Sequence, residues 1–494
     1  MKHQRGTCLF FVCLLLLTFS FVARQETAAQ SNQLILEKEQ HWETYHIGGT
    51  CIGNGHNIFV ADVDGDDIME IITGGSTYNL VNGTRTDRMA PLKIWNWNGQ
   101  NLTLEKSQKW LGGISCVYAG DANGDGKIEI ITSGTVTNST GSYAQLRIWQ
   151  WDGEALVLRA SYEETSGRSI SSVSVSDVNG DGAPEIFTVG RYHNGTEFSA
   201  QLCAWHYDGN SLTLKKSVEW GAANSTIVNS VFVADLNGDV VKEIVTGGYA
   251  NTLKNSSGQL RIWHWNGHDF SLIANEEWRL KDSGYGLTNA GGVMGNTIVN
   301  NVKVGDVDGD GSPEIITGGF AYDGEKVDAQ LRIWSWNGQN LTLEMTQEWT
   351  TQDLVEVESM SINDVDGDGR KEIMTSGVSA ASGSFYSSVP QMAQLRVWSW
   401  DGKALTLKYN SQDWFIDNGA AARNVASGDV DKDGVTEIVT VGCTFLGDLC
   451  DPDMRIWSIP NETASPPYAL LGAVGIVAVI TVAVAFFFTR KKRQ

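Results

Sequence analysis

DVDGDGSPEIITGG, the stretch from Asp306 to Gly319, has six near-copies elsewhere in this chain of 494 residues. The other copies begin at Asp62, Asp121, Asp177, Asp235, Asp364 and Asp429. Successive copies start between 56 residues (Asp121 to Asp177) and 71 residues (Asp235 to Asp306) apart. Repetition at a nearly fixed period indicates an architecture in which each repeat is one supersecondary unit that packs on its neighbours.

Each copy places oxygen-bearing side chains at its first, third, fifth and ninth positions, which are Asp306, Asp308, Asp310 and Glu314 in the copy quoted above. Calcium takes about 6–8 oxygen ligands, and alternate residues of a tight loop can point toward one ion. Carboxylates this close repel one another unless a cation is present. A metal-free Asp-Gly turn is the alternative, but a glutamate at the ninth position of all seven copies favours structural Ca2+.

The sequence therefore predicts up to seven calcium sites, one in each acidic loop. The predicted ligands are Asp62, Asp64, Asp66, Glu70, Asp121, Asn123, Asp125, Glu129, Asp177, Asn179, Asp181, Glu185, Asp235, Asn237, Asp239, Glu243, Asp306, Asp308, Asp310, Glu314, Asp364, Asp366, Asp368, Glu372, Asp429, Asp431, Asp433 and Glu437. The sixth position is glycine in most loops, which suits a positive φ, but it is Val240 in the fourth. Because a β-branched residue resists that conformation, we expect the loop at Asp235 to bind most weakly.

Each repeat predicts four short strands. The first strand precedes the acidic loop, the second resembles EIITGG, the third resembles LRIWSW, and the fourth resembles LTLEKSQKW after an Asn-Gly or Asp-Gly turn. Seven such units predict an all-β fold, a seven-bladed β-propeller over residues 31–459. Tryptophans such as Trp334 and Trp349 recur in the third and fourth strands, so we interpret them as packing residues rather than as sugar- or cofactor-stacking residues.

The two ends of the repeat region complement each other. LILEKEQHW, which ends at Trp42, matches the fourth-strand pattern although it precedes the first acidic loop. The seventh unit stops after MRIWSI and has no fourth strand of its own. We therefore expect the N-terminal strand to complete the last blade, which closes the ring and removes two exposed sheet edges.

The sequences outside the repeats predict export and a membrane anchor. Residues 1–30 have a basic start, an apolar run and small residues near a cleavage site, as in a secretory signal peptide. Residues 468–489 are apolar and uncharged, long enough to span a membrane as one helix. A linker of residues 460–467 precedes this segment, and the basic tail 490–494 follows it, which places the C-terminus inside. Eight Asn-x-Ser/Thr sequons agree with export to the cell surface.

The net charge of −22 is concentrated in the predicted metal sites. Of the 58 acidic residues, 25 occupy ligand positions of the seven loops. Such an acidic chain does not suit nucleic acid as a partner. Among the cysteines, Cys443 and Cys450 lie close together in one loop region and are the expected disulfide pair.

The repeats differ most between their second and third strands, and in the connection 279–301 between two units. In a propeller these loops lie on the face opposite the acidic loops, and the acidic face turns toward the membrane. They carry aromatic residues, namely Tyr78, Tyr143, Tyr192, Tyr249, Tyr322, Phe385 and Tyr386. Variable loops on a rigid scaffold are common binding sites, so an extracellular protein or glycan ligand is expected there. Idle loop sequence shielded by glycans is the alternative.

With their DxDGDGxxE loops and EIITGG strands, residues 33–459 resemble the FG-GAP repeats of the integrin α-subunit propeller and its prokaryotic relatives. The resemblance implies calcium at the first, third, fifth and ninth loop positions, on the face away from the ligand, and a role in adhesion or recognition. The ninth residue is Glu here, whereas integrin loops usually have Asp. Neither an inserted ligand-binding domain nor leg domains follow, so a stand-alone surface module fits better than an integrin-like heterodimer.

Three functions remain after the sequence is read. The first is a calcium-stabilised surface recognition or adhesion module, and it accounts for the anchor, the loops and the resemblance. The second is a cell-surface glycan-processing enzyme, which requires an acid–base constellation that is not repeated in every unit. No such constellation and no G-x-S-x-G nucleophile motif is evident in the sequence, so we predict no enzymatic activity. The third is a structural envelope protein.

Overall fold

The computed structural model describes residues 32–460 except 43–44, 47–55, 82–83, 139–140, 165–166, 194, 222–224, 252–255, 280–286, 290–291, 295–296, 323–325, 352–353, 382–390, 412, 415–418 and 447–448. Leu34–Ser458 forms one compact unit. The predicted signal peptide 1–30, membrane-spanning segment 468–489 and tail 490–494 lie outside the described residues. Within the described residues, no helix is long and apolar enough to cross a membrane.

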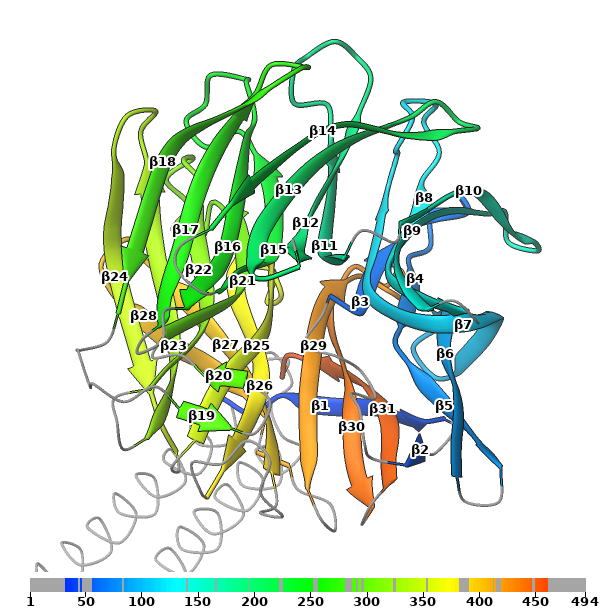
Figure 1. Cartoon of the computed structure of the whole chain (residues 1–494). Helices are drawn as coiled ribbons and strands as arrows, with labels where there is room; N and C mark the ends of the chain where they lie inside the picture. The colour runs from blue at the N-terminus through cyan, green and yellow to red at the C-terminus, as the bar shows by residue number, and fades with distance from the viewer. Residues whose placement is uncertain are drawn as a thin grey trace, which may run out of the picture. The chain divides into compact units, whose positions relative to one another are not determined.

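All the described elements are β-strands, which confirms the predicted all-β class (Figure 1). One eight-stranded sheet contains β3 (Ile58–Ala61), β4 (Glu70–Gly74), β5 (Thr77–Val81), β6 (Thr84–Trp97), β7 (Leu102–Gly120), β8 (Glu129–Asn138), β9 (Gly141–Trp151) and β10 (Leu156–Glu164). The next contains β11 (Arg168–Ser176), β12 (Glu185–His193), β13 (Phe198–Tyr207), β14 (Leu212–Trp220), β15 (Ser225–Ala234), β16 (Glu243–Asn251), β17 (Ser256–Trp265) and β18 (Phe270–Trp278).

A third eight-stranded sheet contains β21 (Thr297–Gly305), β22 (Glu314–Tyr322), β23 (Val327–Trp336), β24 (Leu341–Trp349), β25 (Leu354–Asn363), β26 (Glu372–Ala380), β27 (Gln391–Trp400) and β28 (Leu405–Asn410). The remaining large sheet has five strands, β1 (Ile35–His41), β2 (Tyr45–His46), β29 (Ala420–Gly428), β30 (Glu437–Leu446) and β31 (Leu449–Ser458). A hairpin of β19 (Leu287–Asn289) and β20 (Gly292–Met294) stands apart in the pairing.

Hydrogen bonding thus joins the strands into larger sheets than the seven separate four-stranded sheets that the repeats predict. The long strand β7 is continuous through two repeats, because it pairs with β6 over its first half and with β8 over its second. Single parallel pairings, Phe198 with Ser225 and Val327 with Leu354, connect the repeats in the other two eight-stranded sheets. Within each repeat, consecutive strands pair antiparallel, for example β21 with β22, β22 with β23 and β23 with β24.

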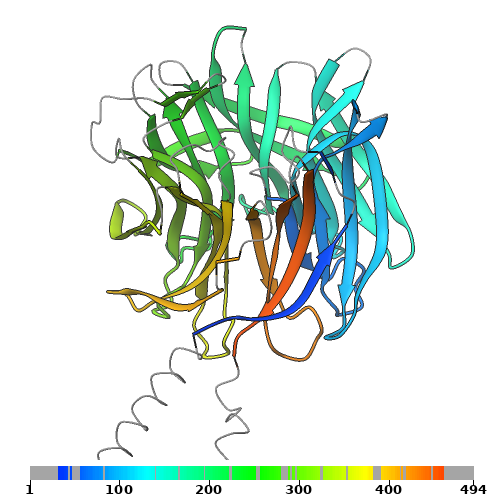
Figure 2. The ribbon, with the colours of Figure 1, turned by 90° about the horizontal axis from the view of Figure 1, so that it is seen from below.

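The predicted pairing of the N-terminal strand is confirmed. β1 pairs antiparallel with β31, from Ile35 opposite Ser458 to His41 opposite Asp453. Figure 2 shows β1, in dark blue, beside the last strand, in orange-red. The Arg455 guanidinium donates a hydrogen bond of 2.6 Å to Glu39 and fastens the two strands together. The first and last strands of the described region therefore lie in one sheet.

The strand before each acidic loop, called here the first strand of its repeat, contacts the first strand of the next repeat. These strands are β3, β7, β11, β15, β21, β25 and β29, and β29 in turn contacts β3. Side chains accept backbone N–H groups across these contacts: Ser172 from Val231 at 3.3 Å, Ser230 from Val302 at 3.1 Å and Asn424 from Asn57 at 3.0 Å. Together the seven first strands line a cavity of about 280 Å³, called here the central cavity.

Tryptophans pack between neighbouring repeats, which confirms their interpretation as packing residues. Trp278 of a fourth strand lies 5.1 Å, between ring centroids, from Trp334 of the next third strand, and Trp42 lies 5.3 Å from Trp95. The indole N–H of Trp334 donates to the Thr317 hydroxyl at 3.1 Å, and all seven third strands repeat this bond. Stacked aromatic pairs contribute about 0.5–1.5 kcal/mol beyond their buried area.

The predicted disulfide between Cys443 and Cys450 is wrong. Cys443 is a free, buried thiol. The register of β30 and β31 places Cys443 opposite Pro452, whereas Cys450 lies opposite Phe445, two residues further along β30. Diagonal positions of that kind lie about 7–8 Å apart between Cα atoms, too far for ordinary disulfide geometry.

The hydrogen bond between Asn424 and Asn57 provides a test of the contact between the last and first repeats. Asn424→Ala removes the acceptor of a buried N–H group, which costs about 1–3 kcal/mol when the donor stays unsatisfied. We expect a lower melting temperature than for the control Asn210→Ala, because Asn210 is exposed and such substitutions usually stay within about 0.5 kcal/mol. Equal melting temperatures for the two variants would show that this contact does not support the fold.

Candidate metal centre

The fifth acidic loop shows how the backbone arranges its carboxylates. Asp306 accepts the N–H groups of Gly309 at 2.7 Å and Gly311 at 3.0 Å. Asp308 and Asp310 each accept, through Oδ1, the N–H two residues further on, at 3.0 and 2.7 Å. These bonds fold the chain tightly around the side chains of alternate residues. The Oδ2 atoms of Asp308 and Asp310 take no part in these bonds and remain as candidate ligands.

The ninth-position glutamate begins the second strand and is buried in every loop. Its Oε2 accepts the N–H of the loop's second residue, for example Glu314 from Val307 at 3.0 Å, and the same bond occurs in all seven loops. Burial, with a smaller contribution from the neighbouring aspartates, raises the pKa of Glu314 to about 7 and that of Glu70 to about 8, although the backbone N–H bond acts in the opposite direction. A charged carboxylate at this position therefore needs a compensating cation.

Four loops bring three acidic groups together with their ligand oxygens within 4.8 Å of one another. These groups are Asp62, Asp64 and Asp66; Asp306, Asp308 and Glu314; Asp364, Asp366 and Glu372; and Asp429, Asp431 and Glu437. This grouping of hard oxygen donors fits a divalent cation such as Ca2+. The fifth-position Asp310, Asp368 and Asp433, and Glu70 in the first loop, belong to the same loops but lie outside these triads.

The second, third and fourth loops keep the same backbone but have an amide at their third position. Asn123, Asn179 and Asn237 accept the N–H of the fifth residue at 2.9 Å in each case. The first residue also keeps its bonds, since Asp235 accepts from Gly238 at 2.7 Å and Val240 at 2.8 Å. The predicted ligands Asp121, Asp125, Glu129, Asp177, Asp181, Glu185, Asp239 and Glu243 occupy the corresponding places. One carboxylate fewer means weaker electrostatic attraction for a cation.

Val240 adopts the strained conformation that the repeat requires. Its φ is 75° and its side chain is 85% exposed. Glycines fill the same position in five other loops, with Gly311 at φ 92°. A left-handed β-branched residue is unfavourable by about 1–2 kcal/mol. Asp67 has a φ of 66° at the same position of the first loop, but an aspartate tolerates this conformation better than a β-branched residue does. The hydrogen bonds of the loop at Asp235 therefore hold it in shape at a larger cost than in the loops with glycine or aspartate at this position.

Neighbouring repeats touch each other at these loops. In each of the first six repeats, the turn between the third and fourth strands contains a glycine that packs on the acidic loop of the preceding repeat, at the third position of that loop. A Cβ on Gly402 would lie 2.8 Å from Asp308 Oδ2. The same relation joins Gly153 to Asp64, Gly209 to Asn123, Gly267 to Asn179, Gly338 to Asn237 and Gly99 to Asp431. The acidic loops and these turns therefore lie together at the same ends of the strands.

The loop at Asp364 departs from this pattern. The seventh repeat takes its fourth strand from β1, so it has no such turn, and no glycine packs on Asp366 among the described residues. Instead the Lys408 ammonium lies among the predicted ligands, in contact with Asp366 and at 3.1 Å from Asp368 and 3.0 Å from Glu372. These carboxylates raise the pKa of Lys408. A lysine therefore supplies positive charge at the place where the other loops group oxygen donors that fit a cation.

Residues on fourth strands were not identified from the loop motif, yet they alter the sites. Glu105 raises the pKa of Glu70, and Glu37 raises the pKa of Asp431, in each case after the larger effect of burial. Glu37, Glu105 and Lys408 occupy equivalent positions of the repeat, three residues after the leucine that starts LTLE, LILE or LTLK. That alignment is the signal by which the sequence could have revealed them. The charge at this position, as well as the loop itself, sets the affinity for a cation.

Substitution of Lys408 tests whether its ammonium takes the place of a calcium ion in the loop at Asp364. Lys408→Met removes the ammonium and leaves the four acidic residues of the loop without it, so we expect the variant to gain a calcium site and to melt lower in chelator than the unchanged protein. Titration calorimetry counts the sites. Lys403→Met, an exposed change in the adjoining turn, is the control and should alter neither quantity. A Lys408→Met variant with an unchanged calcium stoichiometry would contradict the role given to the ammonium.

The raised glutamate pKa values predict how calcium and pH act together. Without metal, the folded-state pKa values of Glu70 and Glu437 are about 8, and those of Glu129 and Glu314 about 7, against an ordinary 4.5. Their contribution to stability is complete below about pH 4.5 and is lost as pH rises through 7–8. We expect the chelated protein to melt lower at pH 8.5 than at pH 5.5, and the increase produced by calcium to grow with pH. Calorimetric melts that show no calcium effect at either pH would contradict the metal assignment.

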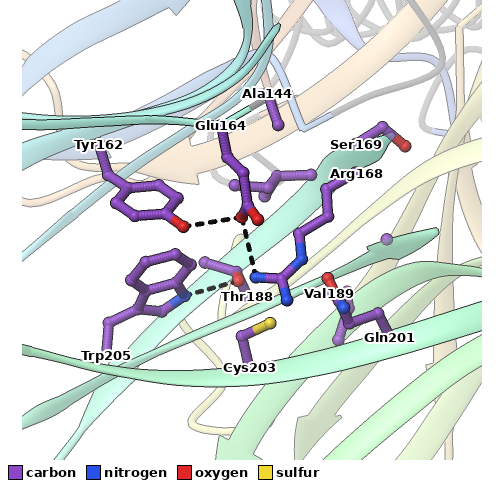
Figure 3. Close-up of a pocket in the computed structure, with 12 residues that line it drawn as sticks. Ala144, Tyr162, Glu164, Arg168, Ser169, Thr188, Val189, Gln201, Cys203 and Trp205 are labelled. Carbon is purple, nitrogen blue, oxygen red and sulfur yellow. Dashed lines mark hydrogen bonds and ion pairs between the residues drawn. The ribbon is translucent and has the colours of Figure 1, made fainter. Parts of the chain in front are cut away.

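A small pocket between two repeats lies apart from the acidic loops (Figure 3). It occurs where the residues of the repeated tryptophan packing differ from those in the other repeats. Tyr162 replaces the usual tryptophan, with its ring centroid 4.6 Å from that of Trp205, and Cys203 replaces the usual arginine. Tyr162 donates a hydrogen bond of 2.7 Å to Glu164, which pairs with Arg168 at 3.0 Å. The cavity measures about 10 Å³, room for about one water molecule. It therefore offers no ligand site.

No known protein family matches the sequence, and no curated protein matches it. Among the solved structures that resemble it, two share 13% sequence identity with this chain. One is a rhamnogalacturonan lyase PL11 of Bacillus licheniformis, with a TM-score of 0.34 over 84% of this chain and 91% of that chain. The other is Sqt1 from Chaetomium thermophilum, with a TM-score of 0.42 over 86% of each chain. Likenesses this distant carry no argument about function.

Proposed function

We propose that this protein is a calcium-stabilised seven-bladed β-propeller that acts in recognition or adhesion at the cell surface. The observation that carries the proposal is the convergence of acidic side chains in the repeated loops, with ligand oxygens within 4.8 Å in four of them. The bound ion supplies positive charge that holds each loop to its carboxylates. Its role is structural, since each loop connects the first and second strands of its repeat and the same loop recurs in every unit.

The propeller architecture accounts for the cyclic contacts of the first strands. Each one contacts the next, and β29 contacts β3. The tryptophan pairs follow the same order, ending with Trp42 on Trp95. The N-terminal strand supplies the fourth strand of the last unit through its pairing with β31. These relations support the proposed ring of seven four-stranded blades.

The loops between second and third strands form the recognition face in this proposal. They lie at the opposite ends of the second strands from the acidic loops, so a ligand there does not compete with calcium. In the third repeat, Phe198 lies 4.6 Å from His193 between ring centroids and is covered by the Arg191 guanidinium at 4.7 Å. An aromatic ring beside a cation suits a protein or glycan ligand. The segments 1–30 and 468–489 would export the chain and anchor it with this face outward.

The enzyme alternative finds little support among the described residues. Glu356 and Glu358 form a buried carboxylate pair that is not repeated in other units, as an acid–base pair would require. Burial raises the pKa of both groups, and Arg423 contacts Glu358. However, neither glutamate lines the central cavity or the Tyr162 pocket. The trio is better explained as an ion pair between two neighbouring first strands.

Binding of the whole chain to cells and glycans tests the proposal. The chain, purified in a non-ionic detergent, is applied to a glycan array and to intact cells, first in calcium and then in chelator. We expect saturable binding that chelator abolishes because the loops that support the face loosen. Substitution of Phe198→Ala should weaken binding without changing the melting temperature in calcium, whereas Val157→Ala, on an exposed fourth strand, should leave it unchanged. Hydrolysis or elimination of any glycan on the array would instead favour the enzyme.

A further inference from the structure

The central cavity has a composition unlike the rest of the protein. All seven first strands contribute to its lining, from His56 in the first repeat to Ser427 in the last. Among the described lining residues there is no aspartate or glutamate, although the chain has 58 acidic residues and a net charge of −22. Lys303 is the lysine of the lining. The central cavity therefore carries a basic group and no acidic one among its described lining residues, although the chain as a whole is acidic.

Lys303 replaces an uncharged residue at a repeated position. It lies three residues before the first aspartate of its loop, where the other first strands have Phe59, Tyr118, Ser174, Phe232, Ser361 and Ala426. Its ammonium faces the ring of Phe232, 5.7 Å from the centroid. Among the described residues, no carboxylate forms an ion pair with it. Burial lowers the pKa of Lys303, as expected for a cation that lacks a counter-ion.

The other titratable groups that face this ammonium are neutral. Burial and the nearby Lys303 charge lower the pKa of His56 to about 3, and its Nδ1 lies 3.2 Å from the Asn301 amide nitrogen. Burial raises the pKa of the Cys116 thiol to about 12. Neither group can balance the lysine at neutral pH. An uncompensated cation in a low-dielectric site attracts an anion more strongly than one at the surface does.

The remaining lining offers hydroxyl groups and apolar walls. Tyr118 and Ser174 are joined by a hydrogen bond that lowers the pKa of the tyrosine against the larger, opposite effect of burial. Ser361 and Ser427 lie 2.9 Å apart between their hydroxyl oxygens. The walls between these groups are apolar and include Phe232. One cation, a few hydroxyls and an apolar surround match a ligand with a single charge and an uncharged body.

We propose that the central cavity binds a small organic monocarboxylate, whose carboxylate pairs with Lys303 and whose body contacts the aromatic and aliphatic lining. A dianion such as phosphate fits less well, because the described lining supplies one cation and no guanidinium. The volume of about 280 Å³ accommodates a molecule about the size of a single sugar or aromatic ring. This site is independent of the recognition face and of the acidic loops.

Titration calorimetry of the whole chain in detergent and calcium tests this site with acetate, benzoate and glucuronate. Benzamide, which has the shape of benzoate without its charge, is the matched neutral probe. We expect at least one carboxylate to bind saturably with one site per chain, and benzamide to bind at least about tenfold more weakly than benzoate. Failure of all three carboxylates to bind would overturn the proposal.

Variants of Lys303 locate the binding. Lys303→Met keeps the length of the side chain without its charge and should weaken carboxylate binding at least about tenfold. Lys303→Arg should retain it, and Lys403→Met, at an exposed position in the turn before β28, should not affect it. Binding that Lys303→Met leaves unchanged would place the carboxylate elsewhere and refute the assignment.

A second measurement covers a Lys303→Met variant that fails to fold. Reductive methylation of the unchanged protein with carbon-13 labels its lysines, and the Lys303 signal is identified by its loss in Lys303→Arg. A bound carboxylate should shift this signal while the Lys403 signal stays in place. A Lys303 signal that does not move under saturating carboxylate would contradict the proposal, whatever the outcome with glycans or cells.

Discussion

The buried ninth-position glutamate is the constraint on which the loops, and through them the sheets, depend. One oxygen of Glu314 fixes the backbone by accepting the Val307 N–H at 3.0 Å, and the residue also starts strand β22. Its other oxygen faces the neighbouring aspartates. The same group thus belongs to the core and to a cluster of like charges. A cation is the simplest way to satisfy both demands, because burial alone favours the protonated acid.

Much of the arrangement could be predicted from the repeated positions. The all-β class, the pairing of the N-terminal strand with the last strand and the stacking of tryptophans follow from patterns that recur in every unit. The loop motif likewise identified the residues that the structure brings together around Asp306 and Asp429. Periodic features are predictable because a residue with the same structural role recurs in each copy. Comparison of the seven copies therefore distinguishes these residues from positions that vary.

What the sequence did not reveal depends on single residues and on register. The grouping of strands into eight-stranded sheets arises from the uninterrupted β7 and from single parallel contacts, which no pattern encodes. The prediction of a Cys443–Cys450 disulfide was wrong because closeness along the chain does not determine which residues lie opposite each other in β30 and β31. Lys303 occupies a position where the other repeats carry uncharged residues, whereas the position of Lys408 holds Lys215 in the third repeat and glutamates in three others. Only the structure shows what surrounds Lys303 and Lys408.

The junction of β1 with β31 has a consequence for the order in which the molecule assembles. Glu39 and Arg455, which meet across it, are separated by 416 residues in the chain. During synthesis β1 emerges before the other described strands and its partner β31 emerges after them, so Ile35 and Leu36 can pair only once all seven repeats have been made. Six repeats have all their strands at hand as they leave the ribosome, and the seventh does not. The final sheet is therefore completed only after the loss of entropy in closing the longest loop in the molecule. Until then β31 presents an unpaired edge, which is open to pairing with another chain.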